Sequence, residues 1–115
     1  MATTIELPHE MVDGKDREVQ VLLADRWRKL VLIQLRHGAV LADHSARFPI
    51  TIQAVAGMGT LRVENETHAL VPGVIVPVDA RVVHNVQGNP NLAILVSFFR
   101  HSESQNENDT TAEFD

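Results

Sequence analysis

The sequence predicts a single all-β domain, built either as a closed barrel or as a two-sheet jelly roll. Between residues 16 and 100, short runs rich in Val, Ile and Leu are separated by turn residues about every ten positions. Apolar residues nowhere recur at helical spacing over three turns free of Gly and Pro. A length of 115 residues with 44% hydrophobic content suffices for one core and is too short for two domains. Many short strands suit these architectures because both hide strand edges.

Nine segments have the alternation or the apolar content of strands. Residues 18–23 alternate, with Val19, Val21 and Leu23 on one face. Residues 29–36 are apolar on both faces, which predicts a central strand. The other seven predicted strands are residues 39–43, 50–56, 60–64, 67–71, 74–78, 82–86 and 91–100.

Turn residues separate these segments. Glu64-Asn65-Glu66 lies between two alternating runs and predicts a hairpin, because Asn tolerates the positive φ that such turns need. Three further turns are predicted from Gly and Pro, at residues 57–59, 72–73 and 88–91. Residues 25–29 allow one short helical turn.

Charge divides the chain unevenly. Residues 102–115 contain five Asp and Glu residues and no Lys or Arg, whereas the rest of the chain balances ten basic residues against ten acidic ones. The sequence therefore predicts an N-terminal segment (1–15), a barrel (16–101) and an acidic, disordered tail (102–115) that is solvated rather than an interaction peptide. No basic patch is apparent that would attract nucleic acid.

Other absences narrow the function further. The chain has no cysteine, which excludes disulfides, thiolate zinc sites and a cysteine nucleophile. Its first ten residues lack the basic and apolar stretches of a signal peptide, and no segment approaches the ~20 apolar residues that span a bilayer. We therefore expect a cytoplasmic protein with neither a membrane nor a nucleic acid as partner.

Two stretches resemble the paired motifs of the cupin family. Residues 38–59, GAVLADHSARFPITIQAVAGMG, resemble the first motif, whose usual form is G-x5-H-x-H-x(3,4)-E-x6-G. Residues 72–88, PGVIVPVDARVVHNVQG, resemble the second, usually G-x5-P-x-G-x2-H-x3-N. The resemblance covers about residues 16–100 and is strongest to small single-domain bacterial cupins (RmlC-like) of unassigned function. It implies a cupin double-stranded β-helix, that is, a jelly-roll barrel.

Half of the ten signature positions match. The matching residues are Gly38, His44, Gly57, Gly73 and His84. The departures are Ala46 at the second histidine, Ile50 (or Thr51) at the glutamate, and Asp79, Arg81 and Gly88 in the second motif. Typical cupins hold one divalent metal, often Fe, Mn, Ni, Cu or Zn, with three histidines and a glutamate. The resemblance thus implies His44 and His84 as metal ligands.

Two imidazoles alone fall short of a usual metal site, which has three or four protein ligands. Gln53 is a candidate to complete the site or to bind substrate, although it needs a bulge near Pro49 to turn inward. His37 and the pair Asp79 and Arg81 are further candidates, the last two at the rim of a pocket. The alternative is that His44 and His84 are pocket residues without a metal, hydrogen-bonded to each other, to water or to a ligand.

Three functions therefore remain open. The first is a metal-dependent enzyme that acts on a small organic molecule, like a dioxygenase or an isomerase. The second is a metal-free barrel that binds or senses a small molecule, which the apolar residues Ala46 and Ile50 favour. The third is a dimerising protein whose barrel is only a packed core. The resemblance also implies a homodimer, with Trp27 as a candidate interface residue.

Overall fold

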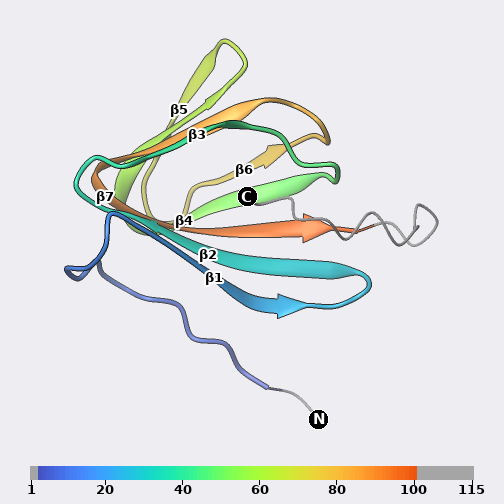
Figure 1. Ribbon diagram of the computed structural model, residues 1–115, viewed down its shortest axis with the longest axis horizontal. Coiled ribbons are helices and arrows are strands. Elements are labelled where there is room, and N and C mark those ends of the chain that lie inside the picture. The colour runs from blue at the N-terminus through green and yellow to red at the C-terminus, as the bar shows by residue number, and fades with distance from the viewer. Residues whose placement is uncertain (1–2, 101–115) are drawn as a thin grey trace.

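The computed structural model describes residues 3–100, and within this range it contains seven strands and no helix (Figure 1). The strands are β1 (Arg17–Ala24), β2 (Arg28–Leu35), β3 (Val40–His44), β4 (Ile50–Val63), β5 (Glu66–Leu70), β6 (Ile75–Val78) and β7 (His84–Phe99). All their pairings are antiparallel. The all-β prediction is confirmed. Nothing in residues 3–100 forms a helix long and apolar enough to span a bilayer.

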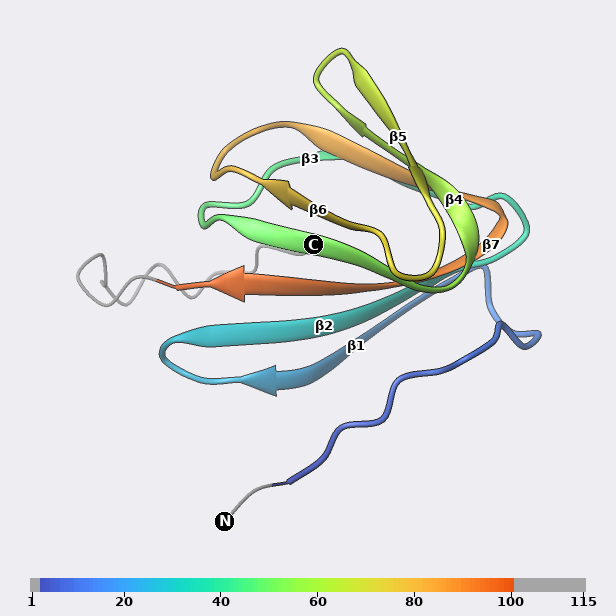
Figure 2. The same ribbon diagram turned by 180° about the vertical axis from the view of Figure 1, so that it is seen from behind.

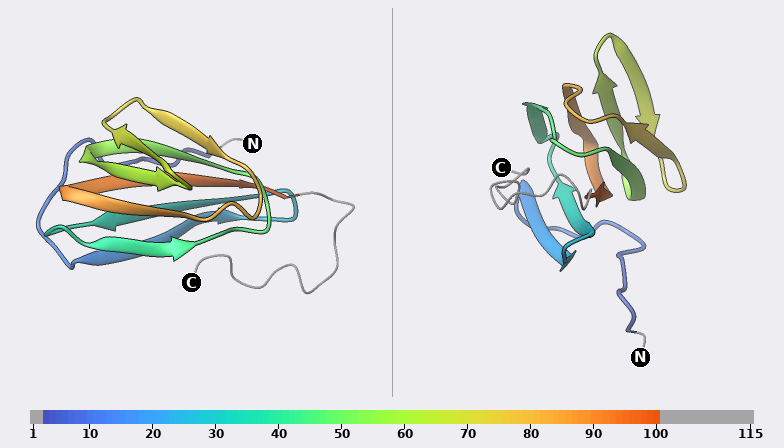
Figure 3. Two further views of the ribbon diagram at one scale, coloured as in Figure 1. Left: turned by 90° about the horizontal axis from the view of Figure 1, so that it is seen from above. Right: turned by 90° about the vertical axis from the view of Figure 1, so that its right-hand side faces the viewer.

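The two longest strands, β4 and β7, belong to both layers of the molecule. Residues 50–57 of β4 pair with residues 92–98 of β7, and β6, β2 and β1 complete this first layer. Residues 59–63 of β4 pair with residues 84–88 of β7, flanked by β5 and β3 in the second layer. The sheet thus folds over on itself as a jelly roll, seen from behind in Figure 2 and from the end in the right-hand view of Figure 3.

Two segments that were predicted as turns, residues 57–59 and 88–91, lie within these continuous strands. Nine predicted strands are therefore seven, because residues 50–56 and 60–64 merge into β4 and residues 82–86 and 91–100 contribute to β7. Gly57 has φ 72°, and a Cβ atom there would collide with the carbonyl oxygen of Asn91. A Cβ on Gly59 would likewise collide with the carbonyl of Gln87. Because glycine has no side chain, the backbones of β4 and β7 can approach each other closely where the sheet folds over. The prediction of turns at these residues did not include this close approach.

The predicted hairpin is confirmed, since Val63 and Glu66 face each other in the β4–β5 pairing. The positive φ falls on Glu64, at 55°. The helical turn allowed for residues 25–29 does not form. Asp25 instead accepts hydrogen bonds from the backbone nitrogens of Trp27 (2.9 Å) and Arg28 (3.0 Å), and this local turn joins β1 to β2.

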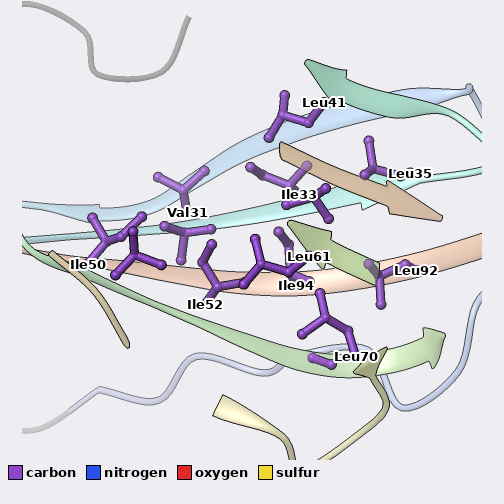
Figure 4. Close-up of a cluster of buried hydrophobic side chains, with 14 of the residues drawn as sticks. Val31, Ile33, Leu35, Leu41, Ile50, Ile52, Leu61, Leu70, Leu92 and Ile94 are labelled. Atoms are coloured by element: carbon purple, nitrogen blue, oxygen red, sulfur yellow. The ribbon is translucent and has the colours of Figure 1, made fainter. Parts of the chain in front are cut away.

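The interior between the two layers is a continuous apolar core. Alternate residues of β2, β4 and β7 point into it, and residues such as Ile33, Ile52 and Ile94 are at most 1% exposed (Figure 4). Val31, Ile33 and Leu35 share the inward face of β2, whereas Leu32 faces outward. Much of the space that a jelly roll could offer to a ligand is thus filled with hydrocarbon side chains.

The N-terminal segment lies against the outward face of the first layer. Leu7 and Met11 pack there on a second, smaller apolar cluster that includes Leu32 and Ala93. The side chain of Arg36 holds this segment on the sheet, because its guanidinium donates hydrogen bonds to the carbonyl oxygens of residues 12 (2.7 Å) and 15 (2.9 Å). Residues 3–16 are called the strap below, and residues 7–15 of the strap contact the sheet although they contribute no strand. The predicted acidic tail lies outside the described residues.

Candidate functional site

His44 and His84 lie directly opposite each other on neighbouring strands. Their Cα atoms pair in the β3–β7 ladder. From the pair Leu41–Val86 to the pair His44–His84, β3 advances by three residues, whereas the antiparallel β7 spans only two. The extra residue in β3 is a bulge. Without it, alternation would place Asp43 rather than His44 beside His84. The bulge thus decides which side chain of β3 faces the histidine of β7.

The two imidazole rings are in contact. Their centroids are 4.4 Å apart, and the ring planes are tilted by 58°. His84 is 3% exposed, and His44 is partly buried. The structure therefore brings together the two histidines that the motif resemblance singled out.

Both rings are held by the same local hydrogen bond. Nδ1 of His44 lies 3.1 Å from the carbonyl oxygen of Ala42, and Nδ1 of His84 lies 3.0 Å from that of Val82. A carbonyl oxygen only accepts, so Nδ1 carries a proton in both rings, and whenever such a ring is neutral its lone pair is on Nε2. Metal-binding histidines are commonly oriented by this kind of bond to a backbone carbonyl.

The surroundings of His84 favour the neutral form of its ring. Burial lowers the pKa of His84 below its ordinary value of 6.5, and the nearby His44 lowers it further. The bond to the Val82 carbonyl and the charge of Asp43 oppose this shift in the pKa without cancelling it. A neutral imidazole is the form that a metal ion or a hydrogen-bond donor requires.

The residues at the other two ligand positions of the resemblance belong to the core. Ala46 is 5% exposed and Ile50 is 3% exposed, and both are part of the main apolar cluster. Within residues 3–100 no three His, Asp or Glu side chains are grouped so that they could share a metal ion. The donor set thus offers an ion two imidazole nitrogens, with any further ligands from water or a small molecule, and it does not fit the four-ligand site of typical cupins.

The spacing of the two rings can be compared with that expected for such a shared ion. Two imidazoles bound to one ion through metal–nitrogen bonds of about 2.0–2.1 Å place their centroids roughly 4.5 to 5 Å apart, depending on the angle at the metal. The observed 4.4 Å separation is slightly shorter.

The structure does not bring Gln53 to the histidines. Residues 50–54 of β4 pair with β7 without a register shift, and the bulge in this strand follows them, between Ala54 and Ala56. Since Ile52 and Ala54 point into the core, Gln53 lies on the opposite face, in the row of Thr51. The inward turn that a substrate-binding role for Gln53 required is thus absent.

His37 also lies away from the pair. Its ring is bonded to Asp16 (2.7 Å) and lies 3.5 Å from Asp13, both at the end of the strap. The hydrogen bond to Asp16 raises the pKa of His37, and its side chain is more than half exposed. Asp79 and Arg81 remain at the end of the sandwich where residues 45–49 turn, with Arg81 N donating to the carbonyl of Ala46 (2.7 Å).

A hollow of about 250 Å³ lies beside His84. It is lined by Asp43, Arg62, Glu64, Val83, His84 and Asn85. Asn85 donates to Asp43 across the β3–β7 pairing (2.7 Å), and Arg62 is the direct partner of Asn85 on β4. Sequence reasoning missed these polar residues, because their meeting depends on the bulge in β3 and on the pairing of distant strands.

Comparison with known proteins identifies the fold of this chain. No family model and no curated protein matches the sequence. A cupin superfamily protein from Desulfitobacterium hafniense is similar in structure, with a TM-score of 0.72 and 13% identity over 78% of this chain and 84% of that one. An RmlC-like cupin from Shewanella frigidimarina gives a TM-score of 0.70 with 21% identity over 78% and 81% of the two chains.

A third similar structure is also covered over most of its length. KdgF from Halomonas sp. superposes with a TM-score of 0.66 and 17% identity, covering 82% of this chain and 89% of its own. The fold of this chain is therefore the RmlC-like cupin jelly roll, as the motif resemblance implied.

Proposed function

We propose that this small cupin-fold chain binds one divalent metal ion through Nε2 of His44 and Nε2 of His84, and that it acts there on a small organic molecule. The observation that carries the proposal is the matched pair of Nδ1 bonds to the carbonyl oxygens of Ala42 and Val82. These bonds direct two acceptor nitrogens from rings whose centroids are 4.4 Å apart. Imidazole nitrogen suits iron, nickel, copper and zinc.

The residues around the ion define its chemistry. Bound there, a divalent ion would act as a Lewis acid or an oxygen activator, with its remaining positions open to water and substrate. His84 supplies a neutral nitrogen because burial depresses its pKa. Action on a small organic molecule is supported by two solved enzymes that contain a similar fold, a salicylate 1,2-dioxygenase from Pseudaminobacter salicylatoxidans and the DMSP lyase DddQ from Ruegeria pomeroyi, of whose chains 26% and 50% are covered. Their identities of 15% and 14% make the reaction a proposal for this chain.

A second candidate function is a metal-free barrel that binds a small molecule without catalysis. It is favoured by Ala46 and Ile50, which give hydrocarbon where typical cupins place ligands, and which are 5% and 3% exposed. In this alternative the two imidazoles act as hydrogen-bond acceptors for a donor group on the ligand.

Metal content distinguishes the two functions. Untagged protein, purified without chelator, should retain close to one equivalent of a divalent transition metal per chain by elemental mass spectrometry. His84→Ala should reduce this content at least about tenfold, because changes even around metal ligands cost roughly 10- to 100-fold in affinity. His68→Ala is the matched control, since His68 lies on β5 beside Glu66, outside the pair.

A chelated sample then separates the outcomes. Ni²⁺ titrated into this folded protein should bind with one-to-one stoichiometry, and His44→Ala and His84→Ala should both abolish this binding. Equal metal content in wild type and His84→Ala would contradict the site. If the folded wild type takes up no Ni²⁺, the metal-free alternative holds, and the next measurement is thermal stabilisation by a library of organic compounds.

A further inference from the structure

One end of the sandwich collects most of the cations of the described chain. The β1–β2 turn, residues 45–49, residues 79–83 and the end of β7 meet at this end (Figure 1). Backbone hydrogen bonds join these segments in pairs: Arg100 N to Trp27 O, Phe99 N to Pro49 O and Arg81 N to Ala46 O. We call this surface the cationic end, and its charged residues are Asp25, Arg26, Arg28, Lys29, Arg47, Asp79, Arg81 and Arg100.

The charge of this end is not apparent from the composition. Six cations and two carboxylates leave the cationic end with four positive charges, although residues 3–100 as a whole are balanced. The remainder of these residues has eight carboxylates against four cations, and carries the compensating four negative charges. Folding thus turns a sequence without a basic patch into a strongly polarised surface.

The acidic tail begins at this same end. Arg100, the last described residue, donates from Nη1 to the carbonyl oxygen of Asp25 (2.6 Å), so the chain leaves the fold from within the cationic end. Residues 102–115 carry five carboxylates and no cation. A flexible segment of 14 residues has a root-mean-square span of about 20 Å. The described chain extends 40 Å, so a segment of this span would reach the cationic end from residue 100 and would not usually reach the opposite one.

We propose that the cationic end is a docking surface whose occupant is the acidic tail of the same chain, residues 102–115. The tether supplies an effective concentration in the millimolar range, so even weak attraction suffices for occupancy. Trp27 and Phe99 add apolar area, since they are 54% and 51% exposed at this end. Phe114 is the one aromatic side chain that the tail offers to them.

This docking gives the tail a function that composition did not suggest. A docked polyanion screens the cationic end from other anions, so the tail competes with anionic small molecules that approach the sandwich from this side. The competition weakens as salt rises, because a Debye length near 8 Å already screens exposed charges at physiological ionic strength. The inference does not depend on a metal at His44 and His84.

A spin label on the tail tests the proposal. The chain has no cysteine, so Thr111→Cys gives a single attachment site for a nitroxide. Backbone amides of residues 25–29, 46–48 and 80–82 should broaden at least about twofold more in about 0.01 M salt than in about 1 M salt, where the Debye length is only about 3 Å. The high-salt spectrum gives the broadening expected from a tether without attraction.

Charge reversal supplies the matched comparison. Arg26→Glu together with Arg81→Glu, both exposed at the cationic end, should remove the excess broadening at low salt. Arg17→Glu together with Arg62→Glu changes the net charge equally at exposed positions outside this end, and should retain the excess. The amide spectrum of each unlabelled variant verifies its fold. Broadening that is independent of salt, or that is lost equally in both double variants, would overturn the proposal.

Discussion

Two polar residues are buried to the same extent in the described chain, and they differ in how their hydrogen bonds are used. Arg36 and His84 are each 3% exposed. Arg36 donates to two carbonyl oxygens of the strap, to Glu18 (2.5 Å) and to Gln34 (3.2 Å). His84 anchors its Nδ1 on the Val82 carbonyl and turns the rest of its ring toward another imidazole.

The difference separates an architectural role from a chemical one. A buried guanidinium is tolerated when its donors are paired, and removal of its partners leaves costly unsatisfied groups. The donors of Arg36 are used to hold the strap on the sheet. His84 has an acceptor nitrogen that the adjacent backbone bond does not use, which is what a ligand site needs. We therefore expect substitutions at Arg36 to affect folding and those at His84 to affect binding.

The largest expected effect is loss of stability in Arg36→Met. The substitution keeps much of the side-chain length but leaves the carbonyl oxygens of Val12 and Lys15 without their donor and removes the ion pair with Glu18. We expect the free energy of unfolding to fall by about 3 kcal/mol. Urea denaturation of this variant and of Arg17→Met, an exposed control on β1, measures the difference.

Amide hydrogen exchange would locate the part of the structure that Arg36→Met destabilises. In Arg36→Met the amides of the strap should exchange with solvent faster, whereas those of Ile52 and Ile94 in the core should keep their protection relative to global unfolding. A loss below about 1 kcal/mol, close to that of the control, would show that the buried guanidinium contributes little beyond its packing.

A smaller effect is expected from Gly14→Ala in the strap. A Cβ atom on Gly14 would lie 2.7 Å from Cζ and 2.7 Å from Nη1 of Arg36. The end of an arginine side chain usually moves aside, but these atoms are fixed by four hydrogen bonds. We expect a destabilisation of about 1–2 kcal/mol by urea denaturation. Lys15→Ala beside it should stay within about 0.5 kcal/mol, and an equally small change in Gly14→Ala would mean that the clamp is loose.

Sequence patterns could predict one of the two buried polar residues but not the other. The alternation of Val82, His84 and Val86 placed His84 on an inward face, and His84 is buried. Arg36 gave no such signal, because its main acceptors are carbonyl oxygens of a strap that has no periodic pattern. Interactions with backbone groups of irregular segments leave no trace in side-chain periodicity.

The same limit applies to the rest of the fold and the site. Alternation and turn residues predicted the jelly roll and the β4–β5 hairpin, but Gly57, Gly59 and Gly88 were interpreted as parts of turns between strands. Glycine serves a turn and a close backbone crossing equally well, and only the pairing partner distinguishes them. The inward position of His44 depends on a bulge in β3, and no residue type in β3 marks where the extra residue falls.

The smallest expected effect is an optimum in stability near pH 6.5, measured by urea denaturation with a chelator present. The pKa of His84 is lowered, so below about pH 6.5 the unfolded chain takes up a proton that the folded chain refuses. Stability should therefore fall as the pH drops, by at most about 1.4 kcal/mol per pH unit for one group. The pKa of His37 is raised by Asp16, so its contribution is complete below pH 6.5 and is lost as the pH rises through the raised pKa.

Single substitutions separate the two opposing slopes. His84→Leu should abolish the acid-side loss and leave the alkaline side unchanged, whereas His37→Gln should flatten only the alkaline side. The reason is that the His37 ring is bound to Asp16 and Asp13 of the strap, far from the imidazole pair. An acid-side loss of unchanged size in His84→Leu would show that other titratable groups, and not the lowered pKa of His84, cause it.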